Sequence, residues 1–220
     1  EEEISISVRP LIEPGAEIFI RRNESIGILR KVKQLKENSF STIVSANDPF
    51  GFDVREDNSY KRVKPNFKLK KFENSISFYY NGWRKDGIGY IDKASIKKNN
   101  SWVDKIKVLI PKAWGSGNTS SDWLNPIIAN SSSACTETYL IVGPFMNKIE
   151  ANNVISYMQT KFFHYMLGII KNTQNTMKKS YSFVPMQDFK ESWTDKKLYK
   201  KYKLSKNEIK IIESSIKKEG

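Results

Sequence analysis

The sequence predicts an α+β fold: a curved, mostly antiparallel sheet with one N-terminal helix, then a long helix and a short helical C-terminal tail. Two observations predict it. Short runs rich in strand-forming residues, separated by turn residues, fill most of the first 145 positions, and apolar residues at helical spacing dominate the remainder. We therefore expect a mixed-sheet unit over residues 1–145. A long helix, a short strand and a basic helical tail over residues 146–220 would pack on it.

The N-terminal part alternates between strand and helix patterns. AEIFI at 16–20 has the composition of a short strand, and Asn23 can cap a helix whose apolar residues recur on one face. FSTIV at 40–44 is typical of an extended segment. NDPFG at 47–51 is typical of a turn, because Asp-Pro and Gly both interrupt regular structure.

Short strands then follow. SISFYY at 75–80 and GIGYI at 87–91 flank NGWRKD, and its Asn-Gly pair favours a tight connection, so a hairpin is predicted. KIKVLIP at 105–111 alternates like another strand, with its lysines on one side. A loop rich in glycine and hydroxyl side chains occupies 111–123, and TYLIVG at 138–143 is apolar enough for a central strand.

The last third has helical patterns. Asn147 and Glu150 have capping-box spacing and open a helix that we expect to continue to about residue 171 along a wide apolar stripe. YSFVP at 181–185 is the expected short strand. Thr194, and then Ser205 with Glu208, would open two short basic helices.

Composition excludes several classes of protein. The longest mainly apolar run, at 162–170, is too short to cross a bilayer, which takes about 20 residues. The single cysteine, Cys135, excludes an internal disulfide and a CxxC zinc or redox motif. The chain opens without a signal peptide, so we expect a cytoplasmic protein, and a piece of a longer one.

No motif predicts a self-contained active site. Asn47-Asp48-Pro49-Phe50 is close to the motif that presents a flipped base in DNA methyltransferases, but it lacks the second proline, and no glycine-rich turn precedes it. Glu208-Ile209-Lys210 matches the E-x-K pattern of metal-dependent nucleases. It lies in a predicted helix in which Glu208 already serves as a capping partner, so charge at helical spacing is the better interpretation. His164 lies in an apolar helix, where a core imidazole is the better interpretation. We expect no catalytic residue, metal or cofactor in these 220 residues.

Binding to a polyanion fits better. Residues 61–112 hold 14 basic and 4 acidic side chains, a surplus of 10 out of a net charge of +13, although a lysine-rich composition alone could produce this. Direct readout of duplex DNA needs hydrogen-bonding side chains on protruding elements. Two loops supply them, and Lys68 could contact phosphate; the candidates are Trp83, Arg84 and Lys85 at the hairpin tip, and Lys112, Trp114, Ser116, Asn118 and Thr119 in the next loop. Alternatively, both are ordinary solvated loops whose tryptophans cover the core.

The later part of the chain carries a resemblance. TETYL, YMQTKFF, FVPMQDF and WTDKKLYKKY, together with NDPFGF and VDKIKVLIPKAWGSG earlier, are similar to the C-terminal part of adenine-specific restriction–modification methyltransferases of type II, some of which also cleave DNA. In that family this part follows the methyltransferase domain and is taken to read the DNA site. The resemblance implies double-stranded DNA and an upstream methyltransferase domain as partners, and S-adenosylmethionine as cofactor of the whole enzyme. Lys161, Lys171 and Gln174 become candidates for phosphate contact.

Three alternatives stay open. A stand-alone restriction endonuclease would cleave DNA by itself with a metal ion. A single-strand or RNA-binding module would stack bases on Trp83, Trp114 and Tyr90. A docking role would use the apolar residues of the C-terminal tail against a catalytic neighbour, namely Leu198, Tyr202, Ile209, Ile212 and Ile216.

Overall fold

The computed structural model describes residues 12, 20, 22–52, 65–82, 87–112, 123–170 and 177–216. The α+β fold class is confirmed. The α-helices are α1 (Glu24–Gln34), α2 (Lys148–Met158), α3 (Lys161–Gly168), α4 (Asp195–Lys201) and α5 (Lys206–Ser215). The strands are β1 (Ser75–Asn81), β2 (Gly87–Asp92), β3 (Ile106–Pro111), β4 (Ile127–Ala129), β5 (Ser133–Cys135) and β6 (Tyr139–Phe145). Short 3₁₀ helices include η1 (Phe40–Ile43), η4 (Asn100–Trp102) and η5 (Lys178–Tyr181).

The strands form two three-stranded sheets, where one continuous sheet was predicted. The outer sheet has the order β2-β1-β5 and the central sheet the order β4-β3-β6. The predicted hairpin is confirmed, since β1 pairs antiparallel with β2 from Ser75 opposite Asp92 to Asn81 opposite Gly87. Only the pairing of β1 with β5 is parallel among the strands described, so the prediction of mostly antiparallel pairing is confirmed as well.

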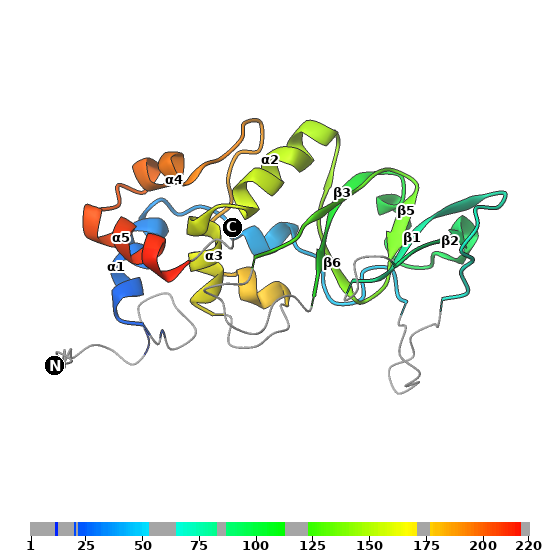
Figure 1. Cartoon of the computed structure of the whole chain (residues 1–220), viewed down its shortest axis with the longest axis horizontal. Helices are drawn as coiled ribbons and strands as arrows, with labels where there is room; N and C mark the ends of the chain where they lie inside the picture. The colour runs from blue at the N-terminus through cyan, green and yellow to red at the C-terminus, as the bar shows by residue number, and fades with distance from the viewer. Residues whose placement is uncertain are drawn as a thin grey trace.

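The central sheet separates two apolar cores. Side chains of β3 and β6 alternate between its faces, as the two-residue period of a strand requires. Val108 and Leu140 belong to the larger core, which they share with the helices, whereas Leu109 and Ile141 face the outer sheet and pack with Phe78 of β1. The result is three layers: helices, central sheet, outer sheet. Figure 1 shows the helices at one end, the hairpin of β1 and β2 at the other, and β3 and β6 between them.

The long helix predicted from residue 147 to about 171 is two helices. Asn147 caps α2 as expected, its side chain accepting a hydrogen bond from the Glu150 amide. The helix ends at Met158, and Thr160 then caps α3 by accepting from the Phe163 amide at 3.1 Å. Both carboxylate oxygens of Asp195 accept from the first two amides of α3. These acceptors satisfy the free N–H groups of a new helix, so the break is stable.

The last two helices pack on α3, and α5 also packs on α1. Their predicted caps are confirmed, with Thr194 accepting from the Lys197 amide and Ser205 forming a capping box with Glu208. Lys31 of α1 reaches Glu208 at 2.5 Å and thereby joins α1 to α5. Residues of α1 therefore lie in the larger core together with the tail, across the predicted boundary at residue 145. The tail residues considered for docking are buried or half-buried against this same chain, namely Leu198, Tyr202, Ile209, Ile212 and Ile216.

Two predicted extended segments are wrong in detail. Residues 40–43 form the 3₁₀ helix η1, because Ser39 accepts from the Ser41 amide and tightens the turn. YSFVP is not a strand: η5 ends at Tyr181, and only an isolated bridge joins Pro185 to Ser39. Of the strand predicted at 16–20, only Ile20 lies within the described residues, and it is buried. No helix in the described ranges is both long and apolar enough to cross a membrane.

Candidate nucleic-acid interface

A buried polar turn links β5 to β6, between the two sheets. It consists of Thr136, Glu137 and Thr138, none of them more than 3% exposed. Buried polar groups are stable only when they are hydrogen-bonded. The partners of this turn are the ends of three other segments, so we call residues 136–138 the anchoring turn.

The residues that directly precede both predicted recognition loops are hydrogen-bonded to Thr138. The Gly82 amide donates to the Thr138 hydroxyl at 2.9 Å, and the Lys112 amide donates to the Thr138 carbonyl at 2.9 Å. Gly82 is the last described residue before the hairpin tip, and Lys112 is the last described residue before the second loop. The last described residues before the two loops, thirty positions apart in sequence, are therefore both hydrogen-bonded to one residue.

The hydroxyls of Thr136 and Thr138 are hydrogen-bonded to each other, and their other partners determine which of the two donates. The Thr136 hydroxyl donates to the Tyr80 carbonyl at 3.1 Å and lies 2.8 Å from the Thr138 hydroxyl. Since a hydroxyl has one proton, Thr138 must donate to Thr136. A chain of hydrogen bonds thus runs from the Gly82 amide through the Thr138 and Thr136 hydroxyls to the Tyr80 carbonyl. It fixes the backbone on both sides of Asn81, where β1 ends.

The anchoring turn also holds the segment that precedes residues 53–64. The Glu137 amide donates to the Phe52 carbonyl at 3.0 Å. Phe52 follows the predicted NDPFG turn, which is confirmed: Asp48 accepts from the Gly51 amide at 2.9 Å, and Gly51 has a φ of 84°. Three chain segments thus meet at residues 136–138.

Position 82 requires a glycine, because its backbone lies very close to the Thr138 carbonyl group. A Cβ atom at Gly82 would lie 2.7 Å from the Thr138 carbonyl oxygen, which is closer than real Cβ contacts allow. The oxygen belongs to the backbone and has no rotamer to escape into. The Asn-Gly pair, read in the sequence as a turn signal, is thus also a packing requirement.

Most predicted contact residues lie outside the described part of the chain. These are Trp83, Arg84, Lys85, Trp114, Ser116, Asn118, Thr119, Lys171 and Gln174. Lys68, Lys112 and Lys161 are described.

Lys68 lies at the hairpin edge, and Lys112 directly precedes the second loop in sequence. The backbone of Lys68 pairs with Tyr90 of β2 in both directions, at 2.8 and 2.7 Å, as an isolated bridge on the outer edge of the hairpin. Lys68, Lys70 and Lys71 are exposed there. The Lys112 ammonium donates to the Asn47 side-chain oxygen at 2.6 Å, which holds it beside the NDPFG turn.

Lys161 lies in a different part of the fold. It begins α3 in the helical layer, and its ammonium forms an ion pair with Glu213 of α5. Burial raises the pKa of the Glu213 carboxyl, but the hydrogen bonds from Lys161 and Tyr199 outweigh it, and the net shift is downward. Lys161 is therefore not brought together with Lys68 and Lys112.

Three groups that could act as a nucleophile or a base, Lys107, Cys135 and His164, are buried. Lys107, predicted on a lysine-bearing side of β3, is fully buried, and its ammonium donates to the carbonyls of Trp102, Val103 and Lys105 at 2.9–3.2 Å. Burial lowers its pKa to about 8. Burial also raises the pKa of the Cys135 thiol well above its ordinary range, which makes it a poor nucleophile. His164 is buried against Trp123, with ring centroids 4.4 Å apart. Within the described ranges no three His, Cys, Asp or Glu side chains form a group that could hold a metal ion.

Comparison with known proteins adds no relative, since neither a family model nor a curated protein matches the chain. The resemblance to restriction–modification methyltransferases therefore stays a prediction.

The anchoring turn had a weak signal in the sequence, because three polar residues stand between two strand-forming runs. Its long-range partners had none.

Proposed function

We propose that this chain recognises a specific sequence in double-stranded DNA, as the target-recognition region of an adenine-specific restriction–modification methyltransferase of type II. One observation carries the proposal: the residues that directly precede both predicted reading loops are hydrogen-bonded to Thr138, through the amides of Gly82 and Lys112. Two loops whose starting points are held close together are well placed to contact neighbouring base pairs of one site. Thr138 holds the two starting points in this way.

The residue types on the two loops suit the major groove. An arginine such as Arg84 pairs in bidentate fashion with guanine, and an asparagine such as Asn118 with adenine. Lys68 is bridged to the edge of the hairpin that carries the first loop, and Lys68, Lys70 and Lys71 are all exposed. Phosphate contacts from these lysines would fix the orientation of the protein without reading sequence.

Catalysis would belong to another part of the enzyme. An upstream domain would flip an adenine from the duplex and transfer a methyl group from S-adenosylmethionine. The buried Cys135, Lys107 and His164 supply no nucleophile or base to a surface. Such an enzyme acts on DNA in the cytoplasm, which agrees with the prediction from the sequence.

Base-specific and phosphate contacts can be separated by mutation. First, a binding site is selected from random duplexes with the purified chain, and the Kd is measured for that site and for a scrambled duplex. We expect Arg84→Ala to weaken binding to the selected site by about 1–3 kcal/mol and to relax preference at one base pair. Lys68→Ala should weaken binding to both duplexes alike and reduce the salt dependence by about one phosphate. Equal losses on both duplexes for Arg84→Ala would refute its role.

Thr138 provides a test of how the first loop is held, because of the two amides only that of Gly82 bonds to its side chain. Thr138→Val removes the hydroxyl that accepts from Gly82 while it keeps the shape, and Thr138→Ser keeps the hydroxyl. If both loops read one site, valine should lower the preference for the selected site more than tenfold and leave binding to the scrambled duplex unchanged. Serine should keep the preference. Loss of preference with serine as well would separate specificity from this hydrogen bond.

A further inference from the structure

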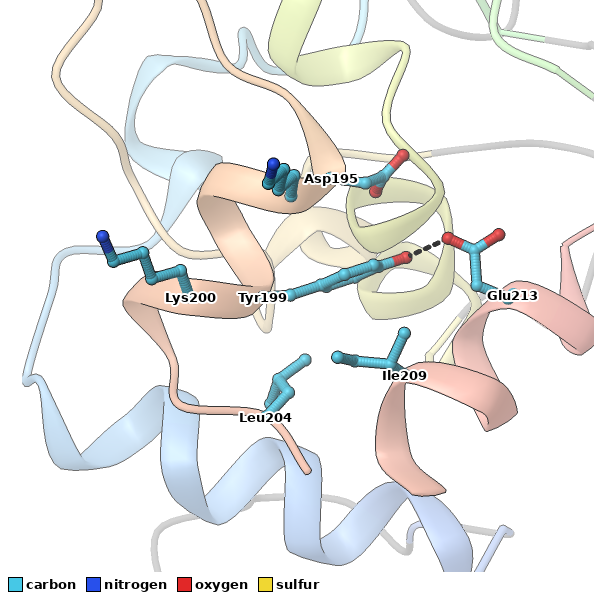
Figure 2. Close-up of a pocket in the computed structure, with 7 residues that line it drawn as sticks. Asp195, Tyr199, Lys200, Leu204, Ile209 and Glu213 are labelled. Atoms are coloured by element: carbon cyan, nitrogen blue, oxygen red, sulfur yellow. Dashed lines mark hydrogen bonds between the residues drawn. The ribbon is translucent and has the colours of Figure 1, made fainter. Parts of the chain in front are cut away.

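A groove between α4 and α5 lies in the helical layer, away from the anchoring turn. It encloses about 410 Å³ and is lined by Asp195, Lys196, Tyr199, Lys200, Leu204, Ile209 and Glu213. Figure 2 shows Leu204 and Ile209 side by side below the Tyr199 ring, with Asp195 and Glu213 on the side nearest α3. Its centre is therefore apolar.

The polar groups of the groove are already used within the fold. The Tyr199 hydroxyl donates to Glu213 at 2.8 Å, and the other oxygen of Glu213 accepts from Lys161. Both oxygens of Asp195 accept from amides of α3. Pockets for small molecules of this size orient their ligand with a few polar groups aimed inward. Since these groups are engaged, the groove suits an inserted apolar side chain better than a small polar molecule.

The rim of the groove is positively charged. Lys196 and Lys200 are one turn apart on α4, both are exposed, and neither forms an ion pair with a described residue. Lys206 precedes Ile209 by one turn of α5 and is likewise exposed. The lining holds two lysines and two carboxylates, but Asp195 is engaged by the α3 amides and Glu213 by Lys161 and Tyr199, which leaves the lysines as the charges open to a partner. The complementary partner is acidic.

We propose that the α4–α5 groove binds an acidic segment of a partner protein, which inserts one large apolar side chain over Leu204 and Ile209 and places its carboxylates beside Lys196, Lys200 and Lys206. This mode of binding combines an apolar anchor with a charged surround. It does not depend on the proposed DNA recognition, because the groove and the anchoring turn belong to different layers.

Selection from random peptides tests the groove directly. Peptides of about a dozen residues, enough for about three helical turns, are displayed and selected on the whole purified chain. We expect the enriched sequences to combine acidic residues with one large apolar residue. Fluorescence anisotropy with a synthetic winner then compares the chain with the double variant Lys196→Glu/Lys200→Glu and with the matched control Lys178→Glu/Lys179→Glu, which places the same charge change on exposed lysines of η5.

The groove variant should raise the Kd of the peptide at least tenfold, and the control should change it less than twofold. Replacing the apolar anchor of the peptide by serine should also abolish binding. Winners without acidic residues, or winners that bind the groove variant and the control alike, would overturn the proposal. An equal loss of duplex DNA binding in the groove variant would overturn it too, because the lysines would then serve phosphates. Failure of the peptide experiments would leave the proposal of DNA recognition by the loops untouched, so the two proposals are tested separately.

Discussion

Lys107 makes the stability of this protein depend on pH in an unusual direction. A lysine in the unfolded chain has a pKa of about 10.4, whereas burial lowers that of Lys107 to about 8 in the fold. Between these values the unfolded state binds more protons than the folded state. Lys107 by itself therefore makes stability rise with pH across this window. The buried Cys135 thiol acts in the opposite direction above the ordinary thiol pKa of about 8.5, because burial raises its pKa in the fold.

The size of the effect follows from the two pKa values. Each pH unit between them corresponds to about 1.4 kcal/mol, so protonated Lys107 reduces the free energy of unfolding by about 3 kcal/mol near pH 7. Raising the pH from 7.5 to 9.5 should remove about 2 kcal/mol of this penalty. The experiment stops at pH 9.5, below the ordinary tyrosine pKa of about 10. Burial raises the pKa values of Tyr157 and Tyr181, so above pH 10 these two hydroxyls would make stability fall as the pH rises.

The assay is urea unfolding at pH 7.5 and 9.5, followed by circular dichroism, for the wild type and for Lys107→Met. Methionine removes the titrating group while it keeps most of the volume. Two of the three carbonyls keep another donor, since Trp102 accepts from the Lys105 amide and Val103 from the Ser133 amide. The variant should therefore fold. Between pH 7.5 and 9.5 the free energy of unfolding should change by about 2 kcal/mol more in the stabilising direction in the wild type than in Lys107→Met, because the opposing effect of Cys135 is common to both. The exposed neighbour Lys105→Met should behave like the wild type. The same pH dependence in wild type and Lys107→Met would refute the argument.

Three substitutions test the contacts that shape the fold, each by urea unfolding. Thr160→Ala removes the cap of α3 and should lower the free energy of unfolding by about 1 kcal/mol, and an unchanged midpoint would contradict the capping role. Tyr202→Phe keeps the stack on Phe162 but deletes a hydroxyl that donates to Glu37 and accepts from Gln187, both at 2.6 Å, and should cost about 1–3 kcal/mol. Gly82→Ala should cost about 1–3 kcal/mol by overpacking, whereas Gly27→Ala in α1, where the new Cβ meets only a flexible Glu208 oxygen at 3.3 Å, should cost less; equal losses would contradict the steric argument.

Local patterns predicted much of this fold. The caps at Asn147, Thr194 and Ser205 and the hairpin of β1 and β2 depend on residues close together in sequence, and all were predicted. Thr160 is a good capping residue too, but the apolar stripe continues through it and favoured one helix. Its break depends partly on Asp195, which is more than thirty positions away.

The candidate site was predictable only in part. Residue types indicated the two loops, but not that they start together, since Thr138 lies 56 positions from Gly82. The alternation of β3 placed Lys107 with solvent-facing lysines. Its burial depends on the turn at residues 102–105, which folds back over the strand and offers three carbonyls. Periodicity in a single strand carries no information about such a turn.

The ion pair of Lys31 with Glu208 has a consequence for synthesis on the ribosome. The two residues are 177 positions apart, so α1 emerges long before its partner helix α5 exists. At a translation rate of about 5–20 residues per second, the wait is on the order of ten seconds or more. Both sheets can assemble in that interval, while the apolar face of α1, with Ile28 and Leu29, has no helix α5 to cover it. A nascent chain stalled before residue 206 should therefore be a good chaperone substrate.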